Sequence, residues 1–174
     1  QMNIIDNDLL SIQEARILAE NAREAQKKLA AYPQEKLDLI VERMAEEISK
    51  HACELAKLSS EETEYGIWQD KYIKNRFVCE YLTNSLRGMR CVGIIKEDQK
   101  NRTMDVGVPI GVIVALCPAT SPVSTTIYKA LIAVKSGNAI IFSLHPRVKE
   151  TMSKTLDTLL QTAEENGLPE GVGG

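Results

Sequence analysis

The sequence has few of the features that mark nucleic-acid-binding or membrane-spanning proteins. Aromatic residues make up only 5% of the 174 residues, and the formal net charge is −3. A base-stacking platform needs aromatic side chains and a nucleic-acid surface needs a basic patch, so we expect no nucleic-acid partner. The apolar run 106–117 is broken by glycine and proline and is too short to span a membrane. The N-terminus has no apolar signal-peptide core behind a basic start, and we expect no membrane partner.

The cysteines exclude several kinds of site. There are four, Cys53, Cys79, Cys91 and Cys117, and no two form a CxxC pair or stand at zinc-ligand spacing from a histidine. We therefore expect no metal site, and we interpret the glutamates of 61–64 as a solvated helix end. Scattered single cysteines are typical of a reducing compartment, so we expect a cytoplasmic protein.

The first ninety residues have the spacing of amphipathic helices. Ser11 and Glu14 form a capping-box pattern, which predicts that a first helix begins there. Pro33 suits the first position of a second helix, and the apolar face that runs through 37–55 predicts one long helix ending near the glutamates of 61–64.

A third helix is expected over 71–86, with Ile73, Phe77 and Tyr81 on one side. Three basic residues of this segment are interpreted as a solvent-exposed face: Lys71, Lys74 and Arg76. After it, the polar residues 96–102 predict a turn between two short extended pieces.

From residue 108 the pattern changes to strand, loop, helix, strand, turn and helix. The β-branched run 110–117 predicts a strand buried on both faces. Ser121 and Pro122 suit the N-cap and first position of a helix that ends at Gly137, and 138–142 predicts a second buried strand.

This order predicts an α/β fold, in which N-terminal helices precede a Rossmann-like parallel β-α-β-α unit with a right-handed crossover. We divide the chain into an N-terminal helical segment, 1–90, and a partial Rossmann-like cofactor-binding domain, 91–174. The last helix begins near Arg147.

Ligands of parallel sheets bind outside the carboxyl ends of the strands. Those ends are the loop Pro118–Pro122 and the turn Ser143–Pro146, which therefore belong to the same sheet edge. Free N–H groups and the positive end of a helix attract anionic or polar ligand groups there. The candidate cofactor-binding residues are Pro118, Ala119, Thr120, Ser121, Ser143, His145 and Pro146.

Each of these signals also has a purely structural interpretation. In that interpretation, Ser121 is only a helix cap. His145 is then a capping residue or a solvent-exposed residue of the turn. Cys117 adjoins the loop, but it ends an apolar strand with no base in view, and we interpret it as a packing residue. The unit lacks a GxGxxG turn, so we do not expect it to cradle a pyrophosphate as a standard Rossmann motif does.

A resemblance to a known family is carried by the segments 64–82 and 92–98 and by the motif PIGVIVALCPATSPVSTTIYKALIAVKSGNAIIFSLHPRVK. Most of the chain resembles the aldehyde dehydrogenase superfamily and especially its coenzyme A-acylating branch. The resemblance implies a cysteine nucleophile that forms a thiohemiacetal, hydride transfer to a nicotinamide, and release of the thioester to coenzyme A. It implies a fold with a Rossmann-like cofactor domain, a catalytic domain and an oligomerisation flap. Only the N-terminal portion is matched, so we expect no catalytic residue in this chain.

The resemblance also bears on the ligands and partners. Hydrolytic members usually have a lysine where this chain has Ser143, a glutamate where it has Pro146 and an oxyanion-hole asparagine where it has Thr120. Acylating members often have an asparagine where it has Ser121. The expected ligands are NAD, with NADP as the alternative, coenzyme A and a small aldehyde. The full-length protein is expected to be a homo-oligomer, with an enzyme-housing shell or a multi-enzyme assembly as a further partner.

Other functions stay open at this level. The chain could be a truncated binding or assembly module without catalysis. Within the enzyme class, a hydrolytic aldehyde dehydrogenase or a phospho-acid reductase is the alternative, and Ser143 in place of lysine argues against the hydrolytic one.

Overall fold

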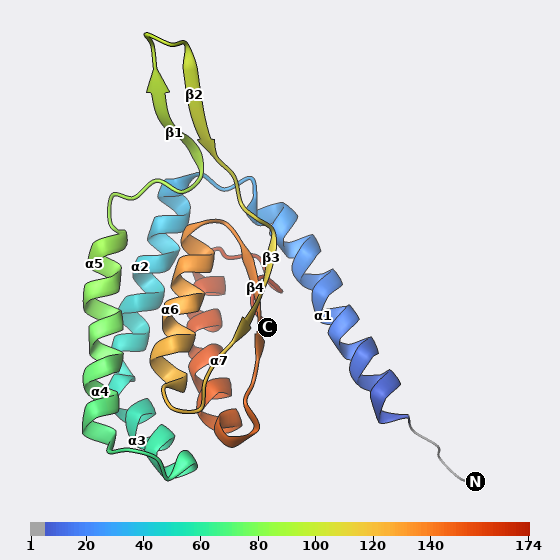
Figure 1. The fold of residues 1–174 in the computed structure, drawn as a ribbon, viewed down its shortest axis with the longest axis vertical. Coiled ribbons are helices and arrows are strands. Elements are labelled where there is room, and N and C mark those ends of the chain that lie inside the picture. Colours follow the sequence, from blue (N-terminus) through green and yellow to red (C-terminus); the bar gives the residue numbers. More distant parts are fainter. Residues whose placement is uncertain (1–5) are drawn as a thin grey trace.

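The computed structural model describes residues 6–174, in which a bundle of helices packs against a small parallel sheet and a two-stranded hairpin protrudes from one end (Figure 1). In chain order the elements are α1 (Asn7–Leu29), α2 (Gln34–Lys50), α3 (Ala52–Thr63), α4 (Trp68–Phe77), the π-helical turn η1 (Val78–Leu82), α5 (Thr83–Leu86), β1 (Gly93–Asp98), β2 (Thr103–Gly107), β3 (Val112–Leu116), α6 (Pro122–Lys135), β4 (Ala139–Ser143), the 3-10 turn η2 (Pro146–Val148) and α7 (Lys149–Glu165). The predicted order of helices followed by a strand-helix-strand-helix unit is confirmed.

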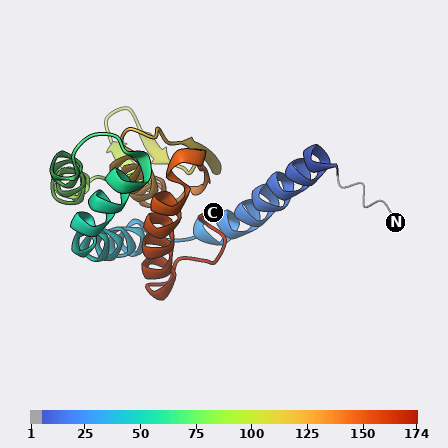
Figure 2. The same ribbon diagram turned by 90° about the horizontal axis from the view of Figure 1, so that it is seen from below.

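Helix α1 begins earlier than the capping-box pattern predicts. Asp6 is its N-cap, and the Oδ1 atom of Asp6 accepts hydrogen bonds from the N–H groups of Asp8 at 3.0 Å and Leu9 at 3.2 Å. Because Asp6 satisfies these free donors, the helix runs on through Ser11, and the predicted start at Ser11 is wrong. Only the C-terminal part, which ends at Leu29, is buried, and the rest extends away from the body (Figure 2).

The single long helix predicted after Pro33 is in fact two helices, α2 and α3. They meet at His51, whose backbone (φ −95°, ψ 0°) departs from the helical geometry, and whose N–H donates to the Ile48 carbonyl at 3.1 Å. Both helices contact α6 and α7, and α3 packs most extensively against α4. The apolar face predicted one helix because it continues across the break at His51. Pro33 is the N-cap of α2 and not its first helical residue.

The third predicted helix is a continuous helical segment made of α4, η1 and α5. Ile73, Phe77 and Tyr81 do share one side, and the Phe77 and Tyr81 rings stack with their centroids 4.9 Å apart. That side is exposed, with 64% of Ile73 accessible, whereas the polar residues Lys71 and Asn75 are buried.

The hairpin and the parallel sheet are separate. Strands β1 and β2 pair antiparallel around the predicted polar turn, where the carboxylate of Asp98 accepts from the backbone of Lys100 and Asn101. Strands β3 and β4 pair parallel, as predicted, with α6 between them in the chain. Gly173 bridges to Ile140 and extends the sheet on the far side of β4.

Strand β3 is not buried on both faces, which corrects that prediction. Ala115 and Cys117 are buried, but Val114 is 67% exposed and Leu116 is 70% exposed. Side chains alternate along a strand, so the buried pair faces α6 and the exposed pair faces away from it. Among residues 6–174, helix α6 covers one face of β3 and leaves the other accessible.

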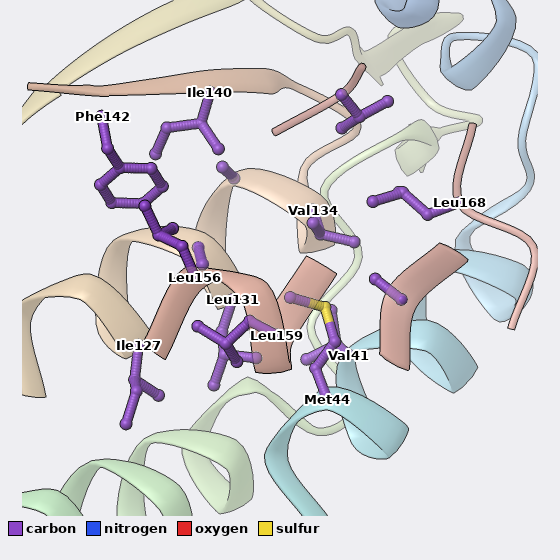
Figure 3. Close-up of a cluster of buried hydrophobic side chains, with 14 of the residues drawn as sticks. Val41, Met44, Ile127, Leu131, Val134, Ile140, Phe142, Leu156, Leu159 and Leu168 are labelled. Carbon is purple, nitrogen blue, oxygen red and sulfur yellow. The ribbon is translucent and has the colours of Figure 1, made fainter. Parts of the chain in front are cut away.

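The core lies between β4 and the helices α2, α6 and α7 (Figure 3). Its labelled side chains are Val41, Met44, Ile127, Leu131, Val134, Ile140, Phe142, Leu156, Leu159 and Leu168. One hydrophobic cluster contains residues of both predicted segments, 1–90 and 91–174. The division of the chain at residue 90 stays a prediction.

Across the described part of the chain, no helix combines the length and the apolar character needed to cross a bilayer.

Candidate functional site

The two predicted ligand segments begin at neighbouring strand ends. Leu116, the last residue of β3, pairs in register with Ser143, the last residue of β4. The loop Pro118–Ser121 follows the first strand, and the turn Ser143–Pro146 follows the second. Because both strands run in the same direction, both segments leave the sheet at the same edge, as predicted. Whether they line one pocket remains a prediction.

Ser121 occupies the N-cap position of α6 without capping it through its side chain. Its backbone (φ −144°, ψ 60°) leads into Pro122 at the start of the helix, and no side chain caps the helix by a hydrogen bond. The hydroxyl Oγ accepts instead from the Lys74 ammonium at 3.4 Å. The purely structural interpretation of Ser121 as a side-chain cap is therefore wrong. No side-chain cap hydrogen bond satisfies the N–H groups of the first turn of α6.

The other residues of this loop differ in burial. Pro118 and Thr120 are exposed, whereas Ala119 is half-buried and packs against the core. The loop is thus anchored by Ala119 and presents Thr120 to solvent at the sheet edge.

A small cavity lies behind Ser121, between α3, α4 and α6. It is lined by Ser59, Lys71, Lys74, Asn75 and the residues Ser121–Ser124. Lys71 is only 7% exposed, and its ammonium donates to the Ser59 hydroxyl at 3.1 Å. Burial, and to a smaller degree the charge of Lys74, lower the pKa of Lys71 below its ordinary value.

The predicted exposed face of Lys71, Lys74 and Arg76 is therefore wrong for Lys71. Lys74 and Arg76 are exposed, and Arg76 pairs with Glu80. Helical spacing could not predict the burial of Lys71, because its hydrogen-bond partner Ser59 comes from another helix.

The second segment is an exposed turn. Ser143, His145 and Pro146 are accessible to solvent, and Leu144 is half-buried. The Nδ1 atom of His145 accepts from the Arg147 N–H at 3.2 Å, so this side chain caps the short turn η2. The capping interpretation of His145 is confirmed, and the ring is held with Nδ1 facing the backbone.

Glu62 makes contacts that the sequence pattern did not predict. Its carboxylate accepts from the N–H of Glu150 at 2.9 Å, from the N–H of Thr151 at 2.8 Å and from the Thr151 hydroxyl. Desolvation would raise the pKa of Glu62, but the hydrogen bonds from Thr151 and Glu150 outweigh it and lower the pKa. The solvated-end interpretation is wrong for Glu62. Between residues 6 and 174, no cluster of three or more potential metal ligands occurs.

The cysteines offer no activated nucleophile. Cys117 is 7% exposed, and its Sγ lies 3.7 Å from the Thr126 hydroxyl, which confirms the packing interpretation. Burial, followed by the charge of Glu80, raises the pKa of the Cys79 thiol to about 11. Cys53 and Cys91 are half-buried and unbridged. The burial of Cys79 and Cys117 makes these two thiols poor nucleophiles, because a thiolate must form and be reached by its reaction partner.

Residues 4–173 match the aldehyde dehydrogenase family. Over 160 residues the chain is 38% identical to the bifunctional aldehyde-alcohol dehydrogenase AdhE of Escherichia coli (strain K12), an alignment that covers 92% of this chain and 18% of that protein.

Two crystal structures have a similar fold. One is a probable aldehyde dehydrogenase from Listeria monocytogenes EGD-e, with a TM-score of 0.93 and 45% identity. The other is an acetylating aldehyde dehydrogenase from Geobacillus thermoglucosidasius, with a TM-score of 0.93 and 41% identity. Each similarity covers 97% of this chain and 37% of the solved chain, so the chain spans a minor part of its relatives.

Proposed function

The chain belongs to the aldehyde dehydrogenase family, and we propose that it supplies the N-terminal, cofactor-binding portion of a coenzyme A-acylating aldehyde dehydrogenase. The observation that carries this proposal is the register pair Leu116–Ser143, since it brings the loop Pro118–Ser121 and the turn Ser143–Pro146 to one sheet edge. The name of the similar acetylating aldehyde dehydrogenase from Geobacillus thermoglucosidasius supports the acylating branch.

The proposed cofactor-binding residues are those at this edge: Pro118, Ala119, Thr120, Ser121, Ser143, His145 and Pro146. The exposed hydroxyl of Ser143 would hydrogen-bond an adenosine ribose, a group that NAD, NADP and coenzyme A all carry. The first turn of α6 would direct its free N–H groups toward a polar ligand group. NAD is our preferred dinucleotide, and Pro146 supplies no carboxylate that would exclude NADP.

The reaction of the complete enzyme would convert an aldehyde, NAD(P)⁺ and coenzyme A into acyl-coenzyme A, NAD(P)H and a proton. A thiolate must attack the aldehyde in such a reaction. Cys79 and Cys117 are buried and Cys53 and Cys91 are half-buried, and the chain spans only 37% of the solved relatives, so we infer that the nucleophile would come from another part of the enzyme. Homo-oligomerisation belongs to the same proposal and is supported by the exposed apolar side chains of the protruding hairpin, Ile94, Ile95, Met104 and Val106.

The test is to compare this chain with the longer polypeptide that contains it. We expect the chain to bind NAD⁺ or NADP⁺ in a calorimetric titration and to form no reduced cofactor from aldehyde and coenzyme A. The longer protein should form reduced cofactor only when both the aldehyde and coenzyme A are present. Turnover without coenzyme A would show a hydrolytic enzyme, and turnover by the chain that Cys117→Ala abolishes would place the nucleophile here.

A further inference from the structure

Helix α7 is capped by a residue from a distant part of the chain. Its N-cap residue, Val148, makes no side-chain cap hydrogen bond. Glu62, 88 residues before Glu150 in the sequence, takes that role by accepting from the Glu150 and Thr151 N–H groups. A carboxylate at a helix N-terminus satisfies free donors and interacts favourably with the helix dipole.

The capped end of α7 follows the proposed ligand turn closely in the chain. Only Leu144–Val148 separate the end of β4 from the first residue of α7. Val148 is fully buried, and α3, which carries Glu62, packs against η2. Ser143 pairs with Leu116 at the start of the turn, Leu144 and Val148 pack at the core, and Glu62 caps the helix that follows.

The contacts within the turn are local by comparison. The Arg147 N–H donates to His145 Nδ1, and the Val148 N–H donates to the His145 carbonyl at 3.0 Å. These bonds shape η2 but do not fix its position relative to the helical bundle. The Glu62 carboxylate links α3 to the first turn of α7, which directly follows η2, with both oxygens used.

We propose that Glu62 is a positioning residue for the Ser143–Pro146 turn, and through that turn for the adenosine-bearing ligand that it receives. The carboxylate acts from behind the turn and does not touch the ligand. The statement about the turn stands on the hydrogen bonds alone, whereas the statement about the ligand rests on the proposed function.

The first test measures the turn without any ligand. Glu62→Gln keeps the side-chain size but removes the charge and replaces one acceptor oxygen with a donor. Glu54→Gln is the matched control, because Glu54 pairs with Lys154 between the same two helices and away from the α7 N-terminus. Thr151→Val is a milder variant that removes only the hydroxyl donor to Glu62.

In amide hydrogen exchange and NMR of the 174-residue chain, Glu62→Gln should lower the protection of Glu150 and Thr151 on the order of tenfold. It should also shift the amide resonances of Ser143 and His145. Thr151→Val should shift the same resonances less, and Glu54→Gln should leave them in place. Unshifted Ser143 and His145 in Glu62→Gln would overturn the inference, because Glu62 would then be a helix cap alone.

The second test adds the ligand. We expect Glu62→Gln to weaken NAD⁺ binding about fivefold, and Glu54→Gln to change it less than twofold. In the longer enzyme, the apparent KM for the dinucleotide should rise while kcat changes little, which general destabilisation would not produce. An unchanged KM overturns the ligand part. Wild-type protein that binds no dinucleotide contradicts the proposed function instead, and the resonance shifts still decide the role of Glu62 in the turn.

Discussion

The ammonium of Lys135 lies 2.6 Å from the carboxylate Oδ1 of Asp38, and the Lys135 side chain is only 4% exposed. The amide of Gln34 donates to the same oxygen at 2.8 Å and to the Lys135 carbonyl at 3.0 Å. These contacts join the start of α2 to the end of α6, and thus the helical segment to the crossover helix of the parallel sheet.

Removing Asp38 should destabilise the protein strongly. Asp38→Ala leaves a buried ammonium without its carboxylate, and we expect a loss of about 2–3 kcal/mol, somewhat below the range for a fully buried pair because Asp38 is 35% exposed. Denaturant unfolding measures this loss. Glu24→Ala, which breaks the exposed pair with Lys27, should cause no measurable change. Equal effects of the two substitutions would contradict the prediction.

The contribution of Glu62 to stability should depend on pH. Its pKa is lower in the folded protein than the ordinary value of 4.5, so the unfolded chain binds its proton first as the pH falls. Its stabilising contribution is fully present above about 4.5 and is lost as the pH falls through the folded value. Unfolding curves from pH 7 to pH 3 should therefore converge for the wild type and Glu62→Gln. Curves that stay parallel would show that the carboxylate is not stabilised by folding.

The four cysteines should react with alkylating reagents at two different rates. Cys79 and Cys117 are buried, and the pKa of the Cys79 thiol is raised to about 11. At pH 8 we expect both to react at least about tenfold more slowly than the half-buried Cys53 and Cys91, since the thiolate is the reacting form and must be reached by the reagent. Mass mapping after brief alkylation gives the rates. Rapid labelling of Cys117 would contradict its position at the end of a buried strand face.

A bulky residue at Ser143 should block the proposed adenosine subsite. In the longer enzyme, Ser143→Trp should raise the apparent KM for the dinucleotide at least about tenfold, through a lost hydrogen bond and a steric clash. The melting temperature should change by less than about 2 °C, because Ser143 is exposed. Ser85→Trp, at an exposed position in α5, is the control and should change neither quantity. A large fall in melting temperature with unchanged KM would identify Ser143 as a structural residue.

Local sequence patterns predicted the parallel unit well. The β-branched run ending at Cys117, the helix that begins at Pro122 and the strand that ends at Ser143 all have periodicities that depend on near neighbours. The parallel direction of the two strands then places the loop and the turn at the same edge of the sheet. What the sequence could not show was the exposure of Val114 and Leu116, because an apolar strand looks the same whether one or both faces are covered.

The sequence by itself therefore determined the α/β class, the parallel pairing of the two strands and the edge that carries the candidate site. The tertiary structure decided the break at His51, the burial of Lys71 beside Ser59 and the cap that Glu62 provides for α7. The physical reason is the range of the interactions. Backbone periodicity and capping by a neighbouring side chain act over a few residues, whereas the partner of a buried ammonium or of a carboxylate from another helix is set by which helices pack together.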